Sequence, residues 1–126
     1  MHIHESSEDY LENILILSKR LPVVRSIDIV NKMNFTKPSV SVAMKRLRQE
    51  GKIEMDPNGF ITLTEKGKAI AEMIYARHEF FSQLLVKLGV PEETADIEAC
   101  HIEHDISQNT FEKLKAWIES TKVLEE

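Results

Sequence analysis

The chain has 126 residues, 42% of them hydrophobic and 29% charged, with a formal net charge of −5 and one cysteine. This length suits one or two small domains; the few glycines and prolines argue against disorder, and no apolar run approaches the roughly 20 residues of a membrane-spanning helix. One cysteine excludes an internal disulfide and the N-terminus shows no signal-peptide pattern, so the composition predicts a cytoplasmic protein with no membrane partner.

The charges are distributed unevenly. The segment from Lys19 to Asp56 carries nine basic and four acidic residues, a net charge of +5, which leaves −10 for the rest of the chain. A basic segment attached to an acidic one can bind phosphate locally although the whole chain is acidic. A nucleic-acid partner is therefore compatible with the negative net charge.

The first predicted element is a helix over about residues 7–20. Tyr10, Ile14 and Leu17 recur at helical spacing behind acidic residues of the first turn, and Pro22 follows the last periodic position. This helix places a stripe of apolar side chains toward a core.

Two short helices joined by a tight turn come next. Ser26 is placed to cap the first, which runs to about Met33, and Thr36 to cap the second, which runs to Glu50. The second helix is basic near its end, a pattern typical of the helix-turn-helix. The residues predicted to contact DNA are Thr36, Lys37, Pro38, Ser39, Ser41, Lys45, Arg46 and, in the following turn, Asn58.

The stretch "KIEMDPNGFITLTEKG" predicts a β-hairpin, because a turn of residues 56–59 separates two short alternating segments. A hairpin here is the wing of a winged helix-turn-helix. The chain is thus expected to be mainly α, with a winged helix-turn-helix DNA-binding domain over residues 1–64 and a helical domain over residues 65–126.

The helical domain is predicted to contain three helices, over about residues 65–88, 91–107 and 109–123, the first capped by Thr64. This domain contains more large apolar residues than a small surface leaves exposed, so we expect them to be buried within the domain or across a dimer interface. These residues are Phe80, Phe81, Leu84, Leu85, Phe111, Leu114 and Trp117.

The stretch "ACHIEH" at 99–104 contains several residue types that bind metal ions: the only cysteine, a glutamate and two histidines. In a helix Cys100, Glu103 and His104 share one face, while His101 lies about 100° away. A thiolate, a carboxylate and an imidazole form half of a site for a divalent transition ion. The best partners elsewhere lie on two other helices, which extends the predicted ligand set to Asp9, Glu12, His78, Cys100, Glu103 and His104.

Simpler interpretations exist for each of these residues alone. Asp9 and Glu12 are also typical acids of a first helical turn, and a single Cys100 is often a small buried hydrophobe. Asp96, one turn before Cys100, is either an auxiliary ligand or a solvated acid.

In these residues the chain resembles the diphtheria toxin repressor family of metal-dependent transcriptional regulators, especially its short branch, the manganese transport regulators. The similarity is carried by "EDYLE" at 8–12, "TKPSVSVAMKRL" at 36–47, "LTEKGKAIA" at 63–71, "RHEFFSQLL" at 77–85, "LGV" at 88–90 and "ACHIEHDIS" at 99–107. The resemblance implies a homodimeric repressor of metal-ion homeostasis, without the SH3-like third domain of longer members. It also implies that the six ligands bind Mn²⁺ or Fe²⁺ as co-repressor, and that the partner is double-stranded operator DNA.

At two positions the chain has features of different branches of this family. Cys100 stands where the manganese-responsive branch usually has Glu and the iron-responsive branch has Cys, whereas Asp9 matches the manganese branch. A thiolate favours softer ions such as Fe²⁺, Co²⁺ or Zn²⁺, and carboxylates favour Mn²⁺. The sequence leaves open which metal is physiological and whether one or two ions bind.

Two other functions are alternatives to metal-dependent repression. One is a winged-helix regulator that senses a small ligand or oxidation of Cys100, since a low-pKa thiol can act as a redox switch. The other is a small metalloenzyme, which lacks support because no nucleophile, base and oxyanion-stabilising group occur together. The sequence therefore predicts that the protein is not an enzyme.

Overall fold

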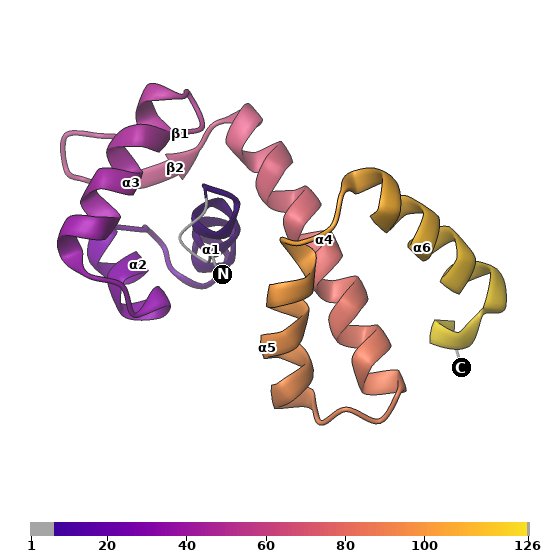
Figure 1. Cartoon of the computed structure of the whole chain (residues 1–126). Helices are drawn as coiled ribbons and strands as arrows, with labels where there is room; N and C mark the ends of the chain where they lie inside the picture. The colour runs from indigo at the N-terminus through magenta and orange to yellow at the C-terminus, as the bar shows by residue number, and fades with distance from the viewer. Residues whose placement is uncertain (1–6, 126) are drawn as a thin grey trace. The chain divides into compact units, whose positions relative to one another are not determined.

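The computed structural model describes residues 7–125 and divides the chain into two compact units, Met1–Met73 and Ile74–Glu126 (Figure 1). Its described part is mainly helical with one two-stranded sheet, as predicted. The elements are α1 (Ser7–Arg20), α2 (Ser26–Met33), α3 (Lys37–Gln49), β1 (Ile53–Met55), β2 (Ile61–Leu63), α4 (Glu65–Lys87), α5 (Glu92–Glu103), α6 (Gln108–Thr121) and a 3₁₀ turn, Val123–Glu125.

The helix α4 belongs to the first unit up to Met73 and to the second from Ile74. The predicted domain boundary, between Thr64 and Glu65, lies at the start of this helix. No helix in residues 7–125 is both long and apolar enough to cross a bilayer.

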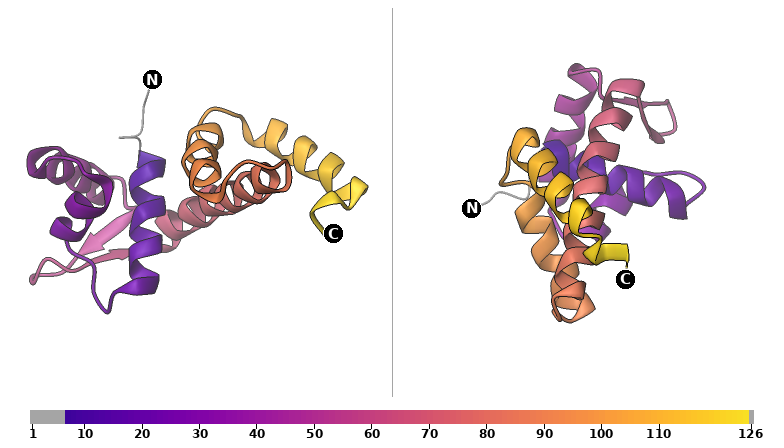
Figure 2. Two further views of the ribbon diagram at one scale, coloured as in Figure 1. Left: turned by 90° about the horizontal axis from the view of Figure 1, so that it is seen from below. Right: turned by 90° about the vertical axis from the view of Figure 1, so that its right-hand side faces the viewer.

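The first unit is a helix-turn-helix with its wing. α2 packs on α3, α1 contacts both helices and β2, and α3 contacts β1 (Figure 2). The interior side chains are fully or almost fully buried, because the apolar stripes of the three helices meet there. They include Leu11, Ile14, Ile29, Val40, Met44, Leu47, Ile53 and Ile61.

The turn between α2 and α3 follows from local chemistry. Asn34 ends α2 in the left-handed conformation (φ 57°), which Asn tolerates better than most residues. The hydroxyl of Thr36 accepts a hydrogen bond from Ser39 N at 3.2 Å and caps α3 as predicted. The predicted cap of α2 by Ser26 is wrong. Arg25 holds that position, since its backbone N–H donates to the carboxylate of Asp28 at 2.9 Å and makes Ser26 the first helical residue.

The wing is an antiparallel hairpin in which Ile53 pairs with Leu63 and Met55 with Ile61. The carboxylate of Asp56 accepts from the backbone N–H groups of Asn58 and Phe60, both at 2.9 Å. This bonding within the turn leaves Asn58 exposed at the tip of the hairpin.

The start of α4 lies directly on the backbone that precedes the hairpin. Thr64 caps the helix by accepting from Gly67 N at 3.1 Å and donates its hydroxyl to Gly51 O at 2.7 Å. A Cβ atom on Gly67 would lie 1.9 Å from Lys52 O. Only glycine permits this approach of helix to backbone.

The second unit is built on an aromatic cluster. Phe80, Phe81 and Phe111 are buried with ring centroids 5.3–5.9 Å apart, and Ala99 and Ile118 complete the core. Burial of the three phenylalanines is as expected. Trp117 differs, with 65% of its surface exposed in this chain.

The helix α5 is shorter than predicted, ending at Glu103 instead of about Ser107. His104 is its C-cap, and Ser107 already caps α6 by accepting from Thr110 N at 3.1 Å. The carbonyl groups left at the end of α5 find a partner in Arg77 of α4, described below. This partner lies too far away in the sequence for a local pattern to indicate it.

Candidate metal centre and DNA-binding surface

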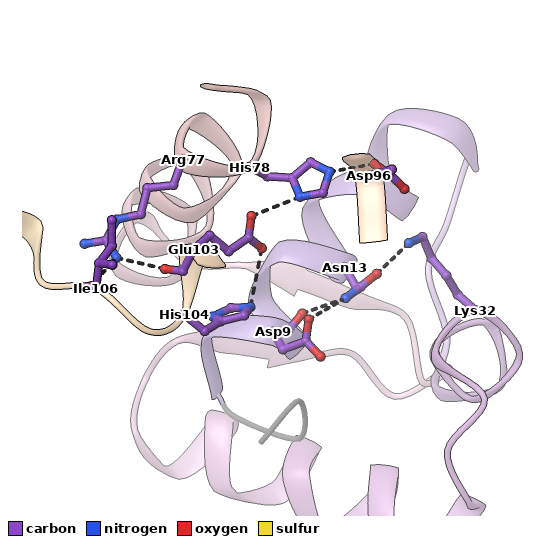
Figure 3. A network of polar contacts seen from close by, with 9 residues as sticks. All are labelled: Asp9, Asn13, Lys32, Arg77, His78, Asp96, Glu103, His104 and Ile106. Atoms are coloured by element: carbon purple, nitrogen blue, oxygen red, sulfur yellow. Dashed lines mark hydrogen bonds and ion pairs between the residues drawn. The ribbon is translucent and has the colours of Figure 1, made fainter. Parts of the chain in front are cut away.

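Three of the predicted metal ligands meet in the second unit around the carboxylate of Glu103 (Figure 3). Glu103 Oε2 lies 2.9 Å from Nδ1 of His78 on α4, and Glu103 Oε1 lies 3.4 Å from Nε2 of His104. The Glu103 side chain is fully buried, and the histidines are 16% and 8% exposed. Each oxygen of one buried carboxylate thus faces an imidazole nitrogen.

Cys100 lies one turn before this pair on α5. Its sulfur and a ring nitrogen of His104 are within 4.8 Å of each other, and the residue is partly exposed. The predicted common face of Cys100, Glu103 and His104 therefore persists, although His104 is the cap of the helix and not part of its interior.

A second carboxylate fixes the far side of the His78 ring. Asp96 Oδ1 on α5 lies 2.7 Å from His78 Nε2, while Nδ1 faces Glu103. A carboxylate on the outer nitrogen is the usual way to orient a metal-binding histidine, because it fixes which nitrogen presents its lone pair. Asp96 thus contacts a predicted ligand, and its own side chain is 69% exposed.

Arg77 anchors the end of α5 from the neighbouring position on α4. Its guanidinium donates to the carbonyl oxygens of Glu103 and Ile106, both at 3.0 Å, and to Oε1 of Gln108 at 2.7 Å. It also lies 5.6 Å from the ring centre of Phe111. Arg77 was not among the predicted site residues; the available signal was an arginine directly beside a candidate ligand on a helix that packs into an apolar core.

The other two predicted ligands, Asp9 and Glu12, lie in the first unit on α1. They are three residues apart in this helix, and both are buried. Asn13 donates to the carboxylate of Asp9 at 3.3 Å and accepts at 2.5 Å from Lys32 of α2. These bonds hold the Asp9 side chain against its own helix.

The donor set of the second unit suits a divalent transition ion. Imidazole nitrogen and thiolate sulfur are ligands for Fe²⁺, Co²⁺ and Zn²⁺, and the carboxylate also suits Mn²⁺. Mg²⁺ and Ca²⁺ are bound mainly through oxygen, so these two ions match the set less well. The residues present fit a transition metal.

The predicted DNA-binding residues lie together on the first unit. Five of them are exposed on α3, Ser39 is half-buried beside them, Thr36 is the cap, and Asn58 is exposed in the wing. The exposed five are Lys37, Pro38, Ser41, Lys45 and Arg46. α3 contains no acidic residue, so its outer face is positively charged.

Both halves of the chain match models of one protein family. Residues 2–59 match the family described as "Iron dependent repressor, N-terminal DNA binding domain", and residues 64–123 match "Iron dependent repressor, metal binding and dimerisation domain". An uncharacterized HTH-type transcriptional regulator of Methanocaldococcus jannaschii, MJ0568, is 35% identical over 94% of this chain and 96% of its own length. The transcriptional regulator MntR of Escherichia coli is 32% identical over 90% of this chain and 74% of its own.

Solved structures show the same architecture. The manganese regulator SloR superposes with a TM-score of 0.79 and 30% identity, over 90% of this chain and 54% of that one. The IdeR protein of T. acidophilum has a TM-score of 0.74 and 28% identity, over 90% and 53%. The chain spans about half the length of these structures.

Proposed function

Because this chain belongs to the iron-dependent repressor family of transcriptional regulators, we propose that it is a cytoplasmic homodimer that binds a palindromic operator when loaded with Mn²⁺ or Fe²⁺. Its task is the regulation of metal-ion homeostasis, not catalysis. The observation that carries the proposal is the buried carboxylate of Glu103 between His78 and His104.

A divalent ion would supply positive charge that the donors of the second unit neutralise. Glu103 offers one oxygen toward each histidine, His78 is oriented by Asp96, and Cys100 offers its sulfur beside His104. Arg77 fixes the backbone at Glu103 and thereby the position of its side chain. The second unit thus contributes four of the six proposed ligands.

Asp9 and Glu12 complete the ligand set in this proposal. Their spacing of three residues on α1 directs both carboxylates to one side of the helix. Ligation by these two residues ties the first unit to the second, so metal binding restricts the positions available to the two DNA-binding units of a dimer.

Metal then acts by shifting a population toward the spacing that DNA requires. A coupling of about 1 to 3 kcal/mol changes DNA affinity by roughly 5- to 150-fold. In each half-site, α3 enters the major groove: Lys37, Ser39 and Ser41 approach base edges, and Lys45, Arg46 and Asn58 bind phosphate. Half-sites about one helical turn apart, or a multiple of it, match the two-fold symmetry of the dimer.

The test is an anaerobic fluorescence-anisotropy titration on a palindrome selected with the metal-loaded protein. Mn²⁺, Fe²⁺, Co²⁺ and Zn²⁺ are compared with chelator for the native chain, His104→Ala and Glu12→Ala. We expect metal to tighten binding by the native chain, and both variants to remain folded dimers that lose this response.

His101→Ala is the matched control, because it removes an exposed histidine from the same stretch. It should respond to metal like the native chain. Equal binding in chelator and in metal contradicts the metal switch. Loss of binding on oxidation of Cys100, without any metal response, would favour a redox-sensing regulator instead.

A further inference from the structure

The outermost row of α3 contains an apolar residue that the proposed DNA contacts do not include. At about 100° per residue, the direction opposite the buried Val40, Met44 and Leu47 is occupied by Pro38, Val42, Lys45 and Gln49. All four are exposed, and Val42 is 61% exposed. The helix thus presents a valine side chain farthest from its own core.

The surroundings of Val42 indicate what covers this side chain. Lys45 and Arg46 follow within one turn and Pro38 precedes it by one turn, and α3 has no acidic residue. Pro38, Val42 and Arg46 also line one hollow of the first unit. An apolar centre on a uniformly basic helix suits an anionic partner that carries an apolar group of its own.

In the major groove one base edge has that property. Thymine presents a C5-methyl group, whereas adenine, guanine and cytosine present only hydrogen-bond donors and acceptors. On the basis of the function proposed above, we propose that Val42 packs on the C5-methyl of a thymine in each half-site and specifies thymine there. Pro38 lies one turn away and extends the same apolar surface.

The contact is testable by removing a single methyl group. In a palindrome selected with the metal-loaded native protein, each thymine pair related by symmetry is replaced in turn by deoxyuridine, which lacks only the C5-methyl. We expect one pair to matter, with a loss of about fourfold per half-site, as for one buried methyl group. The readout is fluorescence anisotropy at fixed salt and saturating Co²⁺.

Val42→Ala identifies the protein side of the contact in a double-mutant cycle. The variant should bind the thymine-containing DNA more weakly than the native chain and should no longer distinguish thymine from deoxyuridine. Gln49→Ala, from the far end of the same row, is the control and should retain the native discrimination. Since Val42 is exposed, we expect Val42→Ala to have the same unfolding temperature as the native chain.

The proposal is overturned if no deoxyuridine pair weakens binding, or if Val42→Ala keeps the native sensitivity to the methyl group. Either result leaves metal-dependent DNA binding intact. Failure of the proposed function is distinct, because it is the absence of tighter binding to the unmodified palindrome in metal than in chelator. Any DNA binding that remains in chelator still reports on the methyl contact.

Discussion

The two units of this chain differ in how they use charged side chains. In the first, the interior is formed mainly by aliphatic side chains such as Ile14 and Leu47. Asp9 and Glu12 of α1 are buried as well, whereas the basic residues expected to contact DNA are exposed on α3. In the second, Arg77 and Glu103 are buried beside the aromatic core.

This difference has a physical cost and a functional meaning. A surface of exposed Lys and Ser residues can be changed with little effect on stability, so it adapts readily to a new operator. A buried carboxylate needs compensating partners, because removing it from water is unfavourable. The folding of the second unit therefore depends on the buried Arg77 and its partners, whereas the exposed cations of α3 make no such contribution to the first.

The sharpest test of this contrast is Arg77→Met, for which we expect the largest loss of stability. It leaves the carbonyl groups of Glu103 and Ile106 and the amide of Gln108 without their donor. We expect the free energy of unfolding to fall by about 3 kcal/mol or more, since each lost bond leaves a buried or half-buried acceptor. Urea unfolding followed by the fluorescence of Trp117, the single tryptophan, reports on the second unit.

The comparison variant is Arg48→Met, which removes an exposed arginine of α3. Its free energy of unfolding should stay within about 0.5 kcal/mol of the native value. Equal effects of the two substitutions would remove the distinction between a polar network inside one unit and polar residues on the surface of the other.

Gly67→Ala tests a packing constraint of the first unit, the close approach of α4 to the backbone of Lys52. The added methyl group would lie 1.9 Å from Lys52 O, so α4 and the residues before the hairpin have to separate. We expect a loss of about 2 to 3 kcal/mol, despite the gain of about 1 kcal/mol in helix propensity. Thermal unfolding measured by circular dichroism checks the value.

Ala69→Gly is the control, since it changes propensity alone at an exposed position two residues later. It should cost about 1 kcal/mol. If Gly67→Ala instead stabilises the protein, the contact between Gly67 and Lys52 is not a constraint on the fold.

Asp96→Asn tests the orientation of His78 with a smaller effect. The amide keeps the shape of the side chain but is a weaker acceptor for His78 Nε2, so His78 presents Nδ1 less reliably. We expect about a tenfold weaker affinity for Co²⁺, the lower end for such outer partners, because Asp96 is exposed. Competition with a chelator measures the affinity.

Two further measurements define the cause of that effect. Glu98→Gln removes one negative charge from the exposed face of the same helix and should leave the affinity unchanged. The nitrogen NMR chemical shifts of the His78 ring should show a change of tautomer in Asp96→Asn and none in Glu98→Gln. Equal losses in both variants would indicate a general charge effect and exclude a positioning role.

The sequence predicted best what short-range signals determine. The tight turn between α2 and α3, the cap at Thr36 and the turn of the hairpin around Asn58 all depend on residues within four positions of one another, and each appears as predicted. The position of α3 and of its basic face followed from these signals.

The features that were missed depend on long-range contacts. Arg77 binds carbonyl groups 26 and 29 residues away, and this contact helps to end α5 earlier than its own sequence suggested. Val42 was missed for a different reason: its spacing already placed it opposite the apolar stripe of α3, but an isolated apolar residue there gave no signal of function until the structure showed it 61% exposed. That the six predicted residues, Asp9 and Glu12 among them, bind a metal stays a prediction.

The smallest predicted effects come from the loss of a helix N-cap, for which each unit supplies one matched hydroxyl residue. Thr36 caps α3 through Ser39 N, and Ser107 caps α6 through Thr110 N, at 3.2 and 3.1 Å. Replacing either by alanine should cost about 1 kcal/mol of stability, because one helix N–H loses its acceptor. Urea unfolding of Thr36→Ala and Ser107→Ala, with Thr36→Ser as the variant that keeps the cap, checks this equality.

The same pair should differ in DNA binding. Thr36→Ala frays the start of the helix that enters the groove, so operator affinity falls about fivefold, whereas Ser107→Ala retains native affinity once metal is saturating. A loss of operator affinity in Ser107→Ala at saturating metal would show that the second unit affects the DNA-binding surface by a route other than metal ligation. Equal affinity of all three variants would instead place the start of α3 outside the DNA contact.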